Sequence, residues 1–453
     1  MLLFLRNVEY FRVLFTHCYP ESCQLQRMRR SRAVWSLLVV AALVCGWTLL
    51  SVNDVYNNSL SDAPVHNAWE DSDEPDGDLD GTLANWRGLT DEQIGQMSEL
   101  GRLLFVDPSL RPPPRPRNFT ILVWRHGKLL ERRHLRRFGD RKLSPWEGCA
   151  VSNCRLTYAD VDLAVADAVV FHLHRTESPA ALPARGPQHA HQRWVFLTDE
   201  SPLHTFLKAR KGTKLSHFDG LFNWSMTYRM DSDVPVPYGR TLALPADGDR
   251  GWQPPEPRTR LAVIMGSNCA RSGNHRWDYV RRLQQLLPGQ VDVYGRCGTL
   301  SCPGHFTKDC PALSQYKFYL SFENSNCREY VTEKLWWNAY HHGAVPVVMG
   351  ASQQDCKRLL PPGSYLHAAD FASLADLARY LQHLDRSPRD YAAFFRWRRR
   401  FRVLNEHGYF GAPSRHYCRL CEALNYNERT PKVYSRLGDF WNAGRDCYPP
   451  YYT

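Results

Sequence analysis

The chain has 453 residues, 12% of them aromatic, and this length exceeds one ordinary hydrophobic core, so we expect two globular domains with appended segments. The formal net charge of +11 is unevenly spread, since residues 111–142 hold eleven Lys or Arg and only two acidic residues. No zinc-finger spacing, RNA-recognition motif or helix-turn-helix signal accompanies this basic stretch, so we expect a solvated or anion-facing surface and no nucleic-acid partner.

Residues 33–53 form an uncharged run of 21 residues with a Leu/Val/Ala-rich middle, which is long enough to span a bilayer. Four arginines precede this run and acidic residues follow it. The positive-inside rule therefore places residues 1–32 in the cytosol and the rest of the chain in the lumen. A cleaved signal peptide is the alternative, and an uncleaved anchor is favoured because the run is long and starts late. Met28 is a second candidate initiator.

Residues 54–117 predict a stem between the anchor and the first domain. Residues 54–80 hold nine acidic residues and no Lys or Arg, and the segment ends in a Pro-rich stretch at 111–117. Such a composition is not expected to bury a core. Glycosylation sequons at Asn57, Asn118 and Asn223 fit a secretory route, although Asn223 lies inside a longer motif where burial would leave it unused.

Eleven of the fourteen cysteines lie beyond the expected anchor. They are Cys149, Cys154, Cys269, Cys297, Cys302, Cys310, Cys327, Cys356, Cys418, Cys421 and Cys447. A lumenal location permits disulfides, and an odd number leaves at least one free or intermolecular thiol. Cys297, Cys302 and Cys310 could instead bind zinc, but no His-Cys quartet of finger spacing is present, so bridges are favoured.

The first globular domain is expected over residues 118–245, with strands at 119–124, 166–172 and 194–197. The third strand ends in a polar loop, Thr198-Asp199-Glu200-Ser201-Pro202. In open α/β sheets, ligands gather at the carboxyl ends of the strands, so this loop is a candidate site. A linker rich in Pro and Gly follows at about 242–258.

The second domain is expected over residues 258–410. Its predicted strands are 261–265, 291–294, 318–322, 344–349 and 364–368, and its predicted helices are 274–287, 330–341 and 372–384. Strands that alternate with helices on both sides of the linker predict an α/β protein with two Rossmann-like domains facing a cleft. The start of the helix at 330 offers unpaired N–H groups and a positive dipole end, which suit phosphate. Residues 411–453 are expected to pack back on the domains.

The segment 316–350 carries a family resemblance. Its runs Phe-Glu-Asn-Ser at 322–325, Tyr-Val-Thr-Glu-Lys at 330–334 and Val-Pro-Val-Val at 345–348 resemble the donor-sugar motif of the α1,3-fucosyltransferases, glycosyltransferase family ten. A bare core element would not need Asn, Tyr, Glu and Lys at these spacings. The resemblance spans about 118–425 and is strongest over 261–350.

The resemblance implies a GT-B fold and a type II Golgi membrane enzyme that moves L-fucose from GDP-fucose to O3 of a GlcNAc in a glycan. Inverting transfer needs a base, cations for the leaving diphosphate and a donor held in line, and it needs no covalent nucleophile. The run Glu-Ser-Pro-x-His at 200–204 is similar to the family motif that supplies the base, which implies Glu200. Asp199 is the rival base.

For the donor, the resemblance implies that Arg276 and Lys334 hold the diphosphate. Further donor contacts are implied at Ser267, Asn268, Tyr294, Asn324, Tyr330 and Glu333. A Lys near a helix N-terminus is disfavoured by the dipole unless an anion is present. Removing Lys334 is therefore expected to leave the donor-free protein no less stable.

The Cys-x-x-Cys at 418–421 is similar to a pair near the family's C-terminus. The resemblance implies that Cys418 and Cys421 are oxidised and tie the C-terminal segment to the first domain, with Cys149 and Cys154 as candidate partners. The chain also departs from the family pattern at two places. Gly266 stands where Val is usual before Ser-Asn, and Thr198-Asp199 stands where Asn-Leu is common.

Two other readings of function remain open. Asp231-Ser232-Asp233 has the Asp-x-Asp form with which manganese-dependent GT-A transferases hold metal, but its surroundings resemble a family segment without a metal role, so we expect loop hydrogen bonding and no metal ligand. A catalytically silent glycan-binding or scaffold member of the fold is the second, disfavoured because Glu200, Arg276 and Lys334 are all present. No cofactor is expected to be required, Mn²⁺ is expected at most to stimulate, and the acceptor glycan and a homodimer are left open.

Overall fold

The computed structural model describes residues 85–135, 144–186, 190–206, 211–245, 256–270, 273–303, 308–410 and 412–451. All of them belong to one compact unit of the chain, Pro64–Thr453. The expected anchor at 33–53, the acidic part of the stem and Asn57 lie outside the described residues. Over the ranges given above, no helix is both long and apolar enough to cross a bilayer.

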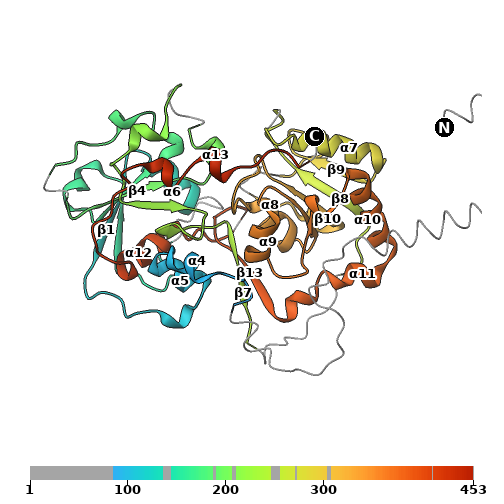
Figure 1. The fold of residues 1–453 in the computed structure, drawn as a ribbon, viewed down its shortest axis with the longest axis horizontal. Helices are drawn as coiled ribbons and strands as arrows, with labels where there is room; N and C mark the ends of the chain where they lie inside the picture. Colours follow the sequence, from blue (N-terminus) through green and yellow to red (C-terminus); the bar gives the residue numbers. More distant parts are fainter. Residues whose placement is uncertain are drawn as a thin grey trace, which may run out of the picture. The chain divides into compact units, whose positions relative to one another are not determined.

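The first half of the described chain builds a six-stranded sheet in the order β2-β1-β3-β4-β5-β6, with every neighbouring pair parallel (Figure 1). The strands are β1 (Phe119–Val123), β2 (Cys154–Thr157), β3 (Ala168–His172), β4 (Arg193–Leu197), β5 (Trp224–Thr227) and β6 (Val234–Pro235). Parallel strands covered on both faces have nearly continuous apolar sequences, and β3 is buried at all five positions. The strands predicted near 119, 166 and 194 are confirmed.

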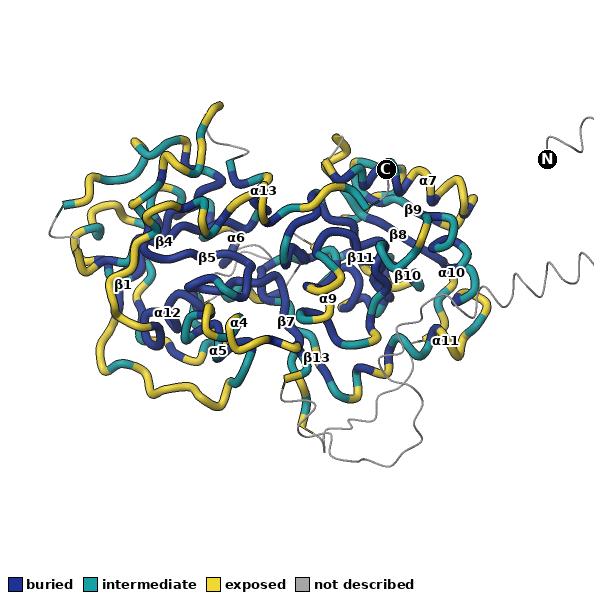
Figure 2. The backbone as a smooth tube through the Cα atoms, viewed as in Figure 1, coloured by how far each residue is buried: buried dark blue, intermediate teal, exposed yellow. Residues whose placement is uncertain are grey.

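The second half builds a five-stranded sheet in the order β12-β11-β10-β8-β9, again parallel throughout. The strands are β8 (Arg260–Met265), β9 (Val291–Tyr294), β10 (Tyr316–Phe322), β11 (Val345–Met349) and β12 (Leu366–His367). All five predicted strands are therefore confirmed. Figure 2 shows strands of both sheets, including β4, β5 and β8, as buried segments.

The helices agree less closely with the sequence-based predictions than the strands do. They are α4 (Asp91–Gly95), α5 (Glu99–Phe105), α6 (Gly127–Leu135), α7 (Arg276–Leu286), α8 (Glu333–Leu335), α9 (Gln353–Leu359), α10 (Leu374–Arg386), α11 (Pro388–Ala393), α12 (His416–Tyr426) and α13 (Ala443–Asp446). The helix predicted over 330–341 starts three residues later, at Glu333, and α8 continues as a π-helix, η10 (Trp336–His341).

A short antiparallel ribbon joins strand β7 (Gly239–Ala243), which follows the first sheet, to β13 (Phe401–Asn405), which follows the second. Residue 239 must be glycine, because a Cβ atom there would lie 2.4 Å from the Trp336 ring and 2.6 Å from the carbonyl oxygen of Leu404. The ribbon thus brings both halves of the chain against the π-helix.

The prediction that the stem extends to residue 117 is wrong for its last part. Helix α5 buries Leu100, Leu103, Leu104 and Phe105 in the same core as strands of the first sheet. Arg87 is also buried, and its Nε donates to the carbonyl of Phe105 at 3.0 Å. The spacing of Leu100, Leu103 and Leu104 is that of one helical face, a signal that the acidic residues before it obscured.

The C-terminal segment packs on the first half, as expected, and α12 is buried along its whole length. Cys418 lies opposite Cys149 with a Cα–Cα distance of 5.4 Å, and Cys421 lies opposite Cys154 at 6.0 Å, both within the range of disulfides. The remaining bridges are Cys269–Cys297, Cys302–Cys310 and Cys327–Cys447. Because Cys297, Cys302 and Cys310 are all in disulfides, they cannot serve as zinc ligands, and the zinc alternative is wrong. Among the described cysteines, Cys356 is the free thiol, and it is buried.

We predict that peptide mapping of the full-length chain without reductant will recover Cys149 with Cys418 and Cys154 with Cys421. Each bridge closes a loop of more than 260 residues, with separations of 269 and 267, so each is expected to add about 3–5 kcal/mol to the free energy of unfolding. Cys356 should be alkylated only after unfolding, which serves as the internal control. Free thiols at 418 and 421 in the native protein would contradict the pairing.

The sequon candidates differ in accessibility. Asn118 is exposed. Asn223 is buried, its Nδ2 donates to the carbonyl of Lys432 at 2.7 Å, and its Oδ1 accepts from the Trp194 amide at 2.8 Å. Because the nitrogen that would carry a glycan is enclosed, Asn223 is not an acceptor in the folded protein, and that candidate is corrected.

Candidate active site

Glu200 lies three residues beyond the carboxyl end of β4 and is partly buried. Its Oε2 accepts a hydrogen bond from the hydroxyl of Tyr330 at 3.2 Å and another from Nδ2 of Asn324 at 3.4 Å. Tyr330 and Asn324 belong to the loop between β10 and α8, in the other half of the chain. The predicted base therefore sits where the carboxyl ends of two parallel sheets meet, as the strand-end argument requires.

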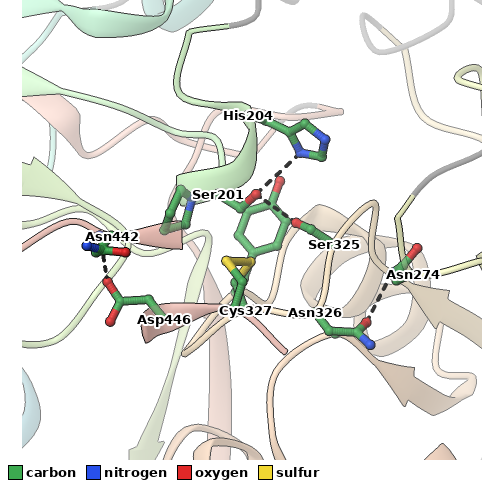
Figure 3. The surroundings of a disulfide bond; sticks show 12 residues. Ser201, His204, Asn274, Ser325, Asn326, Cys327, Asn442 and Asp446 are labelled. Carbon is green, nitrogen blue, oxygen red and sulfur yellow. Dashed lines mark hydrogen bonds between the residues drawn. A yellow bond between two sulfur atoms is a disulfide. The ribbon is translucent and has the colours of Figure 1, made fainter. Parts of the chain in front are cut away.

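A second contact joins the same two loops. The hydroxyl of Ser325 donates to Ser201 Oγ at 2.7 Å, and Ser201 Oγ lies 3.3 Å from Nδ1 of His204 (Figure 3). Ser201 and Ser325 are both buried. Burial lowers the pKa of His204 below its ordinary value, although the neighbouring Glu200 carboxylate acts in the opposite direction. The lowered pKa favours the neutral form of the His204 ring, which lies in hydrogen-bonding distance of Ser201.

The rival base, Asp199, has a different environment from its neighbour. Only 2% of Asp199 is exposed, and its Oδ1 lies 3.1 Å from Nε2 of His416 and 3.1 Å from Nε2 of His407. An acceptor hydroxyl cannot reach a carboxylate enclosed in this way. Of the two neighbouring acids, Glu200 is the one that can meet a substrate.

Arg276 is the first of the two cations that the sequence predicted for the donor diphosphate. It is the first residue of α7, it is 5% exposed, and its guanidinium donates to the carbonyl of Asn268 at 2.9 Å. Its Nε is buried and has no hydrogen-bond partner among the described residues. Burial lowers the pKa of Arg276 below its ordinary value, and the carboxylates of Glu323 and Glu333 partly oppose that shift. A buried guanidinium with a spare donor can bind an incoming anion.

Lys334 is the second predicted cation, and it has two carboxylate neighbours. Its Nζ donates to Glu323 Oε2 at 2.8 Å and to Thr332 Oγ1 at 2.8 Å, and lies 3.4 Å from Glu333 Oε1. Burial disfavours the ammonium, but the carboxylates of Glu323 and Glu333 outweigh it and raise the pKa of Lys334 above its ordinary value. Because Lys334 compensates the buried charge of Glu323, these contacts argue against the expectation that the donor-free protein would be no less stable without Lys334.

Tyr330 connects the loop between β10 and α8 to the candidate base Glu200. Burial raises the pKa of its phenol well above the ordinary value, and the carboxylates of Glu200 and Glu323 add to that shift. Its ring packs on Tyr228 with a centroid distance of 5.0 Å. The sequence implied only a donor contact for Tyr330 and Asn324, whereas the structure also brings both of them to the base.

The other predicted donor residues lie at the edge of this cluster. Ser267 and Asn268 follow β8, and the Asn268 carbonyl accepts both from Arg276 and from Nε1 of Trp277 at 2.8 Å. Tyr294 ends β9 and packs edge-on against Tyr316. Gly266, a departure from the family pattern, has a steric reason, because a Cβ atom there would lie 2.5 Å from the Trp277 ring.

Three residues of the site had no predicted role, namely Ser201, His204 and Glu323. Ser201 and His204 lie inside the Glu-Ser-Pro-x-His run, and Glu323 inside Phe-Glu-Asn-Ser, so their position in the motifs was the available signal. Glu323 is 2% exposed, and its Oε1 accepts from the amide of Thr332 at 2.8 Å. It fixes the start of α8 and the ammonium of Lys334 together.

The two carboxylates of the Asp-x-Asp triplet are paired with other groups of the fold. Asp231 pairs with Arg229 and lies 3.1 Å from Arg328, and Asp233 accepts from the Ser225 amide at 2.8 Å and from Lys432 at 2.6 Å. Both carboxylates therefore have cationic and hydrogen-bonding partners in the fold. They support loop structure, which was the expectation for this triplet.

A carboxylate able to take a proton, a buried guanidinium and a partly buried ammonium meet at the facing ends of two parallel sheets. That combination defines an enzyme that transfers a group from an anionic donor to a hydroxyl. Residues 116–239 match the family description "Fucosyltransferase, N-terminal", and residues 255–440 match "Glycosyltransferase family 10 (fucosyltransferase) C-term". The chain belongs to glycosyltransferase family 10, the fucosyltransferases.

Individual relatives agree with this membership. The chain is 36% identical over 350 residues to alpha-(1,3)-fucosyltransferase 7 of Rattus norvegicus, covering 75% of this chain and 84% of that protein. It is 40% identical over 259 residues to the human 4-galactosyl-N-acetylglucosaminide 3-alpha-L-fucosyltransferase, covering 55% and 67%. A solved alpha1,3-fucosyltransferase with GDP-fucose is similar with a TM-score of 0.39 and 16% identity, covering 66% of this chain and 87% of the other.

Proposed function

We propose that this enzyme transfers L-fucose from GDP-fucose to O3 of a GlcNAc residue, with inversion at the anomeric carbon. The observation that carries the proposal is the pair of hydrogen bonds to Glu200, from Tyr330 at 3.2 Å and from Asn324 at 3.4 Å, in a chain that also brings the cations Arg276 and Lys334 to the same loops. The relatives are alpha-(1,3)-fucosyltransferases, which supports the same linkage.

In this mechanism Glu200 accepts the proton of the acceptor hydroxyl while the hydroxyl oxygen attacks the anomeric carbon of fucose. The bond from that carbon to the β-phosphate oxygen breaks, and its electron pair leaves with GDP. Arg276 and Lys334 neutralise the charge that grows on the diphosphate. Ser267, Asn268, Tyr294, Asn324 and Glu333 are assigned to hold the nucleotide and the sugar. No cofactor is required, and Mn²⁺ stimulates at most.

Tyr330 is expected to act on the base more than on the donor. We predict that Tyr330→Phe lowers kcat about 10- to 100-fold, because one hydrogen bond to a charged group contributes about 1.5–3 kcal/mol, and that the GDP dissociation constant changes much less. Steady-state kinetics and GDP titration would measure both. Tyr228→Phe is the matched control, since the Tyr228 hydroxyl is buried in ring contact with Tyr330 and has no hydrogen-bond partner among the described residues. A variant with weaker GDP binding and normal kcat would restrict Tyr330 to the donor.

For the acceptor, we propose a GlcNAc that carries a 4-linked galactose, because the human relative's name states that acceptor. The test is GDP release by the full-length, detergent-solubilised chain with GDP-fucose and a panel of acceptors. The panel holds N-acetyllactosamine, LacdiNAc, a core chitobiose glycan and a protein O-glycan, and product linkage is determined by NMR. Fucose on O3 of GlcNAc in N-acetyllactosamine supports the proposal. No transfer to any acceptor, with GDP-fucose still bound, would instead indicate a catalytically silent member.

We also propose a GT-B arrangement, with the two sheets facing a donor and acceptor cleft, on a type II protein of the Golgi membrane whose catalytic part is lumenal. The uncharged run at 33–53, the arginines before it and the disulfides of the described part support this location. Protease protection of the C-terminal part in intact Golgi vesicles would test it. Digestion of the catalytic part in intact vesicles would contradict it.

A further inference from the structure

A basic cavity of about 40 Å³ lies at the end of the first sheet that faces away from the candidate base. Its wall includes Phe119, Arg193 and Trp224, which are the first residues of β1, β4 and β5. Glu200 follows the opposite, carboxyl end of β4. The five residues of β4, at about 3.3 Å each, separate the two places, so the transfer mechanism does not use this cavity.

Arginine dominates the charge of the cavity. The charged side chains of its lining, histidine aside, are Arg115, Arg117, Arg193, Arg429, Asp167 and Glu428. Arg115 and Arg117 belong to the basic stretch at 111–142, to which fucosyl transfer assigns no role. Four cations against two anions leave an excess of positive charge on a concave surface, and such a surface attracts anions.

Neutral groups hold two of these arginines in place. Nε of Arg115 donates to the carbonyl of Asn425 at 2.7 Å, and its Nη2 donates to the carbonyl of Asn427 at 2.8 Å. Arg193 donates through Nη2 to the carbonyl of Arg429. Because a carbonyl oxygen carries no net charge, these hydrogen bonds fix the two guanidinium groups without neutralising them.

Aromatic rings restrict the arginines further. The guanidinium of Arg117 lies 4.4 Å from the centroid of the Phe119 ring, and that of Arg193 lies 5.6 Å from the centroid of the Trp224 ring. Arg117 is also paired with Asp167, so one of the four charges has a partner of opposite sign. Cation–π attraction orders the side chains but supplies no counter-charge. The cavity therefore presents positive groups that are already positioned.

The arginines are close enough to repel one another. Burial, and then the guanidinium groups of Arg429, Arg117 and Arg193, lower the pKa of Arg115 below its ordinary value. Like charges held together are unfavourable, and an anion placed among them turns this repulsion into attraction. A local conflict of this kind is expected at a binding site, where the ligand supplies the compensation.

We propose that this cavity binds one sulfate or phosphate group, as a free ion or as an ester on a larger molecule. The planar fork of a guanidinium matches the oxygens of such a group with two parallel hydrogen bonds. Since a cavity of about 10–15 Å³ already holds a water molecule, about 40 Å³ leaves room for a small oxyanion and not for a whole nucleotide. The exposed Arg117 and Arg429 mark the side on which an attached sugar or other carrier continues into solvent.

Calorimetric titration of the full-length, detergent-solubilised chain with sodium sulfate and with sodium phosphate tests the site. Chloride keeps the ionic strength constant, and one saturable site per chain is expected. Heats that show no saturation with either ion would overturn the proposal. A heparin hexasaccharide and its desulfated form distinguish the sources. Tighter, sulfate-dependent binding of the hexasaccharide would identify a sulfated sugar as the ligand, and saturation by the inorganic ions alone would identify a free ion.

Variants locate the anion. Arg117→Gln and Arg429→Ala should each weaken sulfate binding about tenfold or more, because each removes a charge-assisted hydrogen bond. Both side chains are exposed, so the fold should persist. Arg282→Ala, which removes an exposed arginine from α7, should bind sulfate like the wild type. Unchanged sulfate affinity in both Arg117→Gln and Arg429→Ala would also overturn the proposal.

The anion site and the transfer reaction can be tested separately. Glu200→Gln should bind sulfate with unchanged affinity. Arg429→Ala should transfer fucose to an unsulfated acceptor at the wild-type rate, because Arg429 lies at the opposite end of the sheet from the base. Loss of sulfate binding in Glu200→Gln would contradict a site separate from the active site.

Discussion

Glu200→Gln is expected to abolish fucosyl transfer while leaving the affinity for GDP-fucose nearly unchanged. The amide can still accept from Tyr330, so the loop geometry persists, but it cannot take the proton of the acceptor hydroxyl. A positioned general base contributes about 10²–10⁴-fold, and kcat should fall by that factor. Single-turnover assays with a saturating acceptor, alongside GDP-fucose titration, measure the two quantities separately.

The control for that substitution is Glu177→Gln, which neutralises an exposed carboxylate on the loop after β3. Its kcat should equal that of the wild type, since Glu177 makes no contact with the candidate site. If Glu200→Gln turned over at a near-normal rate, the base would lie elsewhere. Asp199 would be the next residue to test, although its enclosure by histidines argues against it.

The strands could be predicted because a parallel sheet covered on both faces selects apolar runs. Val345–Met349 is buried at every position, and its sequence alone marked it as a strand. The β7–β13 ribbon could not be predicted, because its partners are separated by more than 150 residues and Arg240 lies inside it. Arg240 is buried with Glu406, which accepts from it at 2.8 Å, and with the Leu104 carbonyl, which accepts from it at 3.0 Å, and no local pattern reveals these pairings.

The candidate site could be predicted as a set of positions but not as a set of contacts. Glu200, Asn324 and Tyr330 were each identified through short motifs, yet nothing in the motifs indicated that they touch one another. The same holds for Lys334. Its position near a helix start predicted a positive charge that is unfavourable unless an anion binds. In the structure Glu323, eleven residues earlier, already compensates this charge, with its Oε2 2.8 Å from Nζ of Lys334. Side-chain pairing across a turn depends on the fold and cannot be predicted from helix periodicity.

Lys334→Ala is therefore expected to have two separable effects. The value of kcat/KM should fall roughly 10²-fold or more, because the ammonium no longer meets the charge that grows on the leaving GDP, and GDP binding should weaken. The free energy of unfolding should also fall, by about 1–3 kcal/mol, because the buried carboxylate of Glu323 loses its cation. Lys357→Ala, an exposed lysine on α9, should change neither quantity.

The stability loss should depend on pH. Burial, together with Glu333 and against the pull of Lys334, already raises the pKa of Glu323 above its ordinary value, and removing the ammonium raises it further. A carboxyl whose pKa is higher in the folded state favours folding when it is protonated. The deficit of Lys334→Ala in urea denaturation should therefore be largest near neutral pH and shrink as the pH falls towards that raised pKa.

Adding Glu323→Gln to Lys334→Ala separates the structural role of the lysine from its catalytic one. The double variant carries no uncompensated charge at position 323, so most of the lost stability should return. Catalysis should not return, because the diphosphate still lacks its second cation, and GDP should still bind weakly. If activity and stability recovered together, Lys334 would be only a partner for Glu323, and Arg276 would remain as the cation assigned to the leaving group.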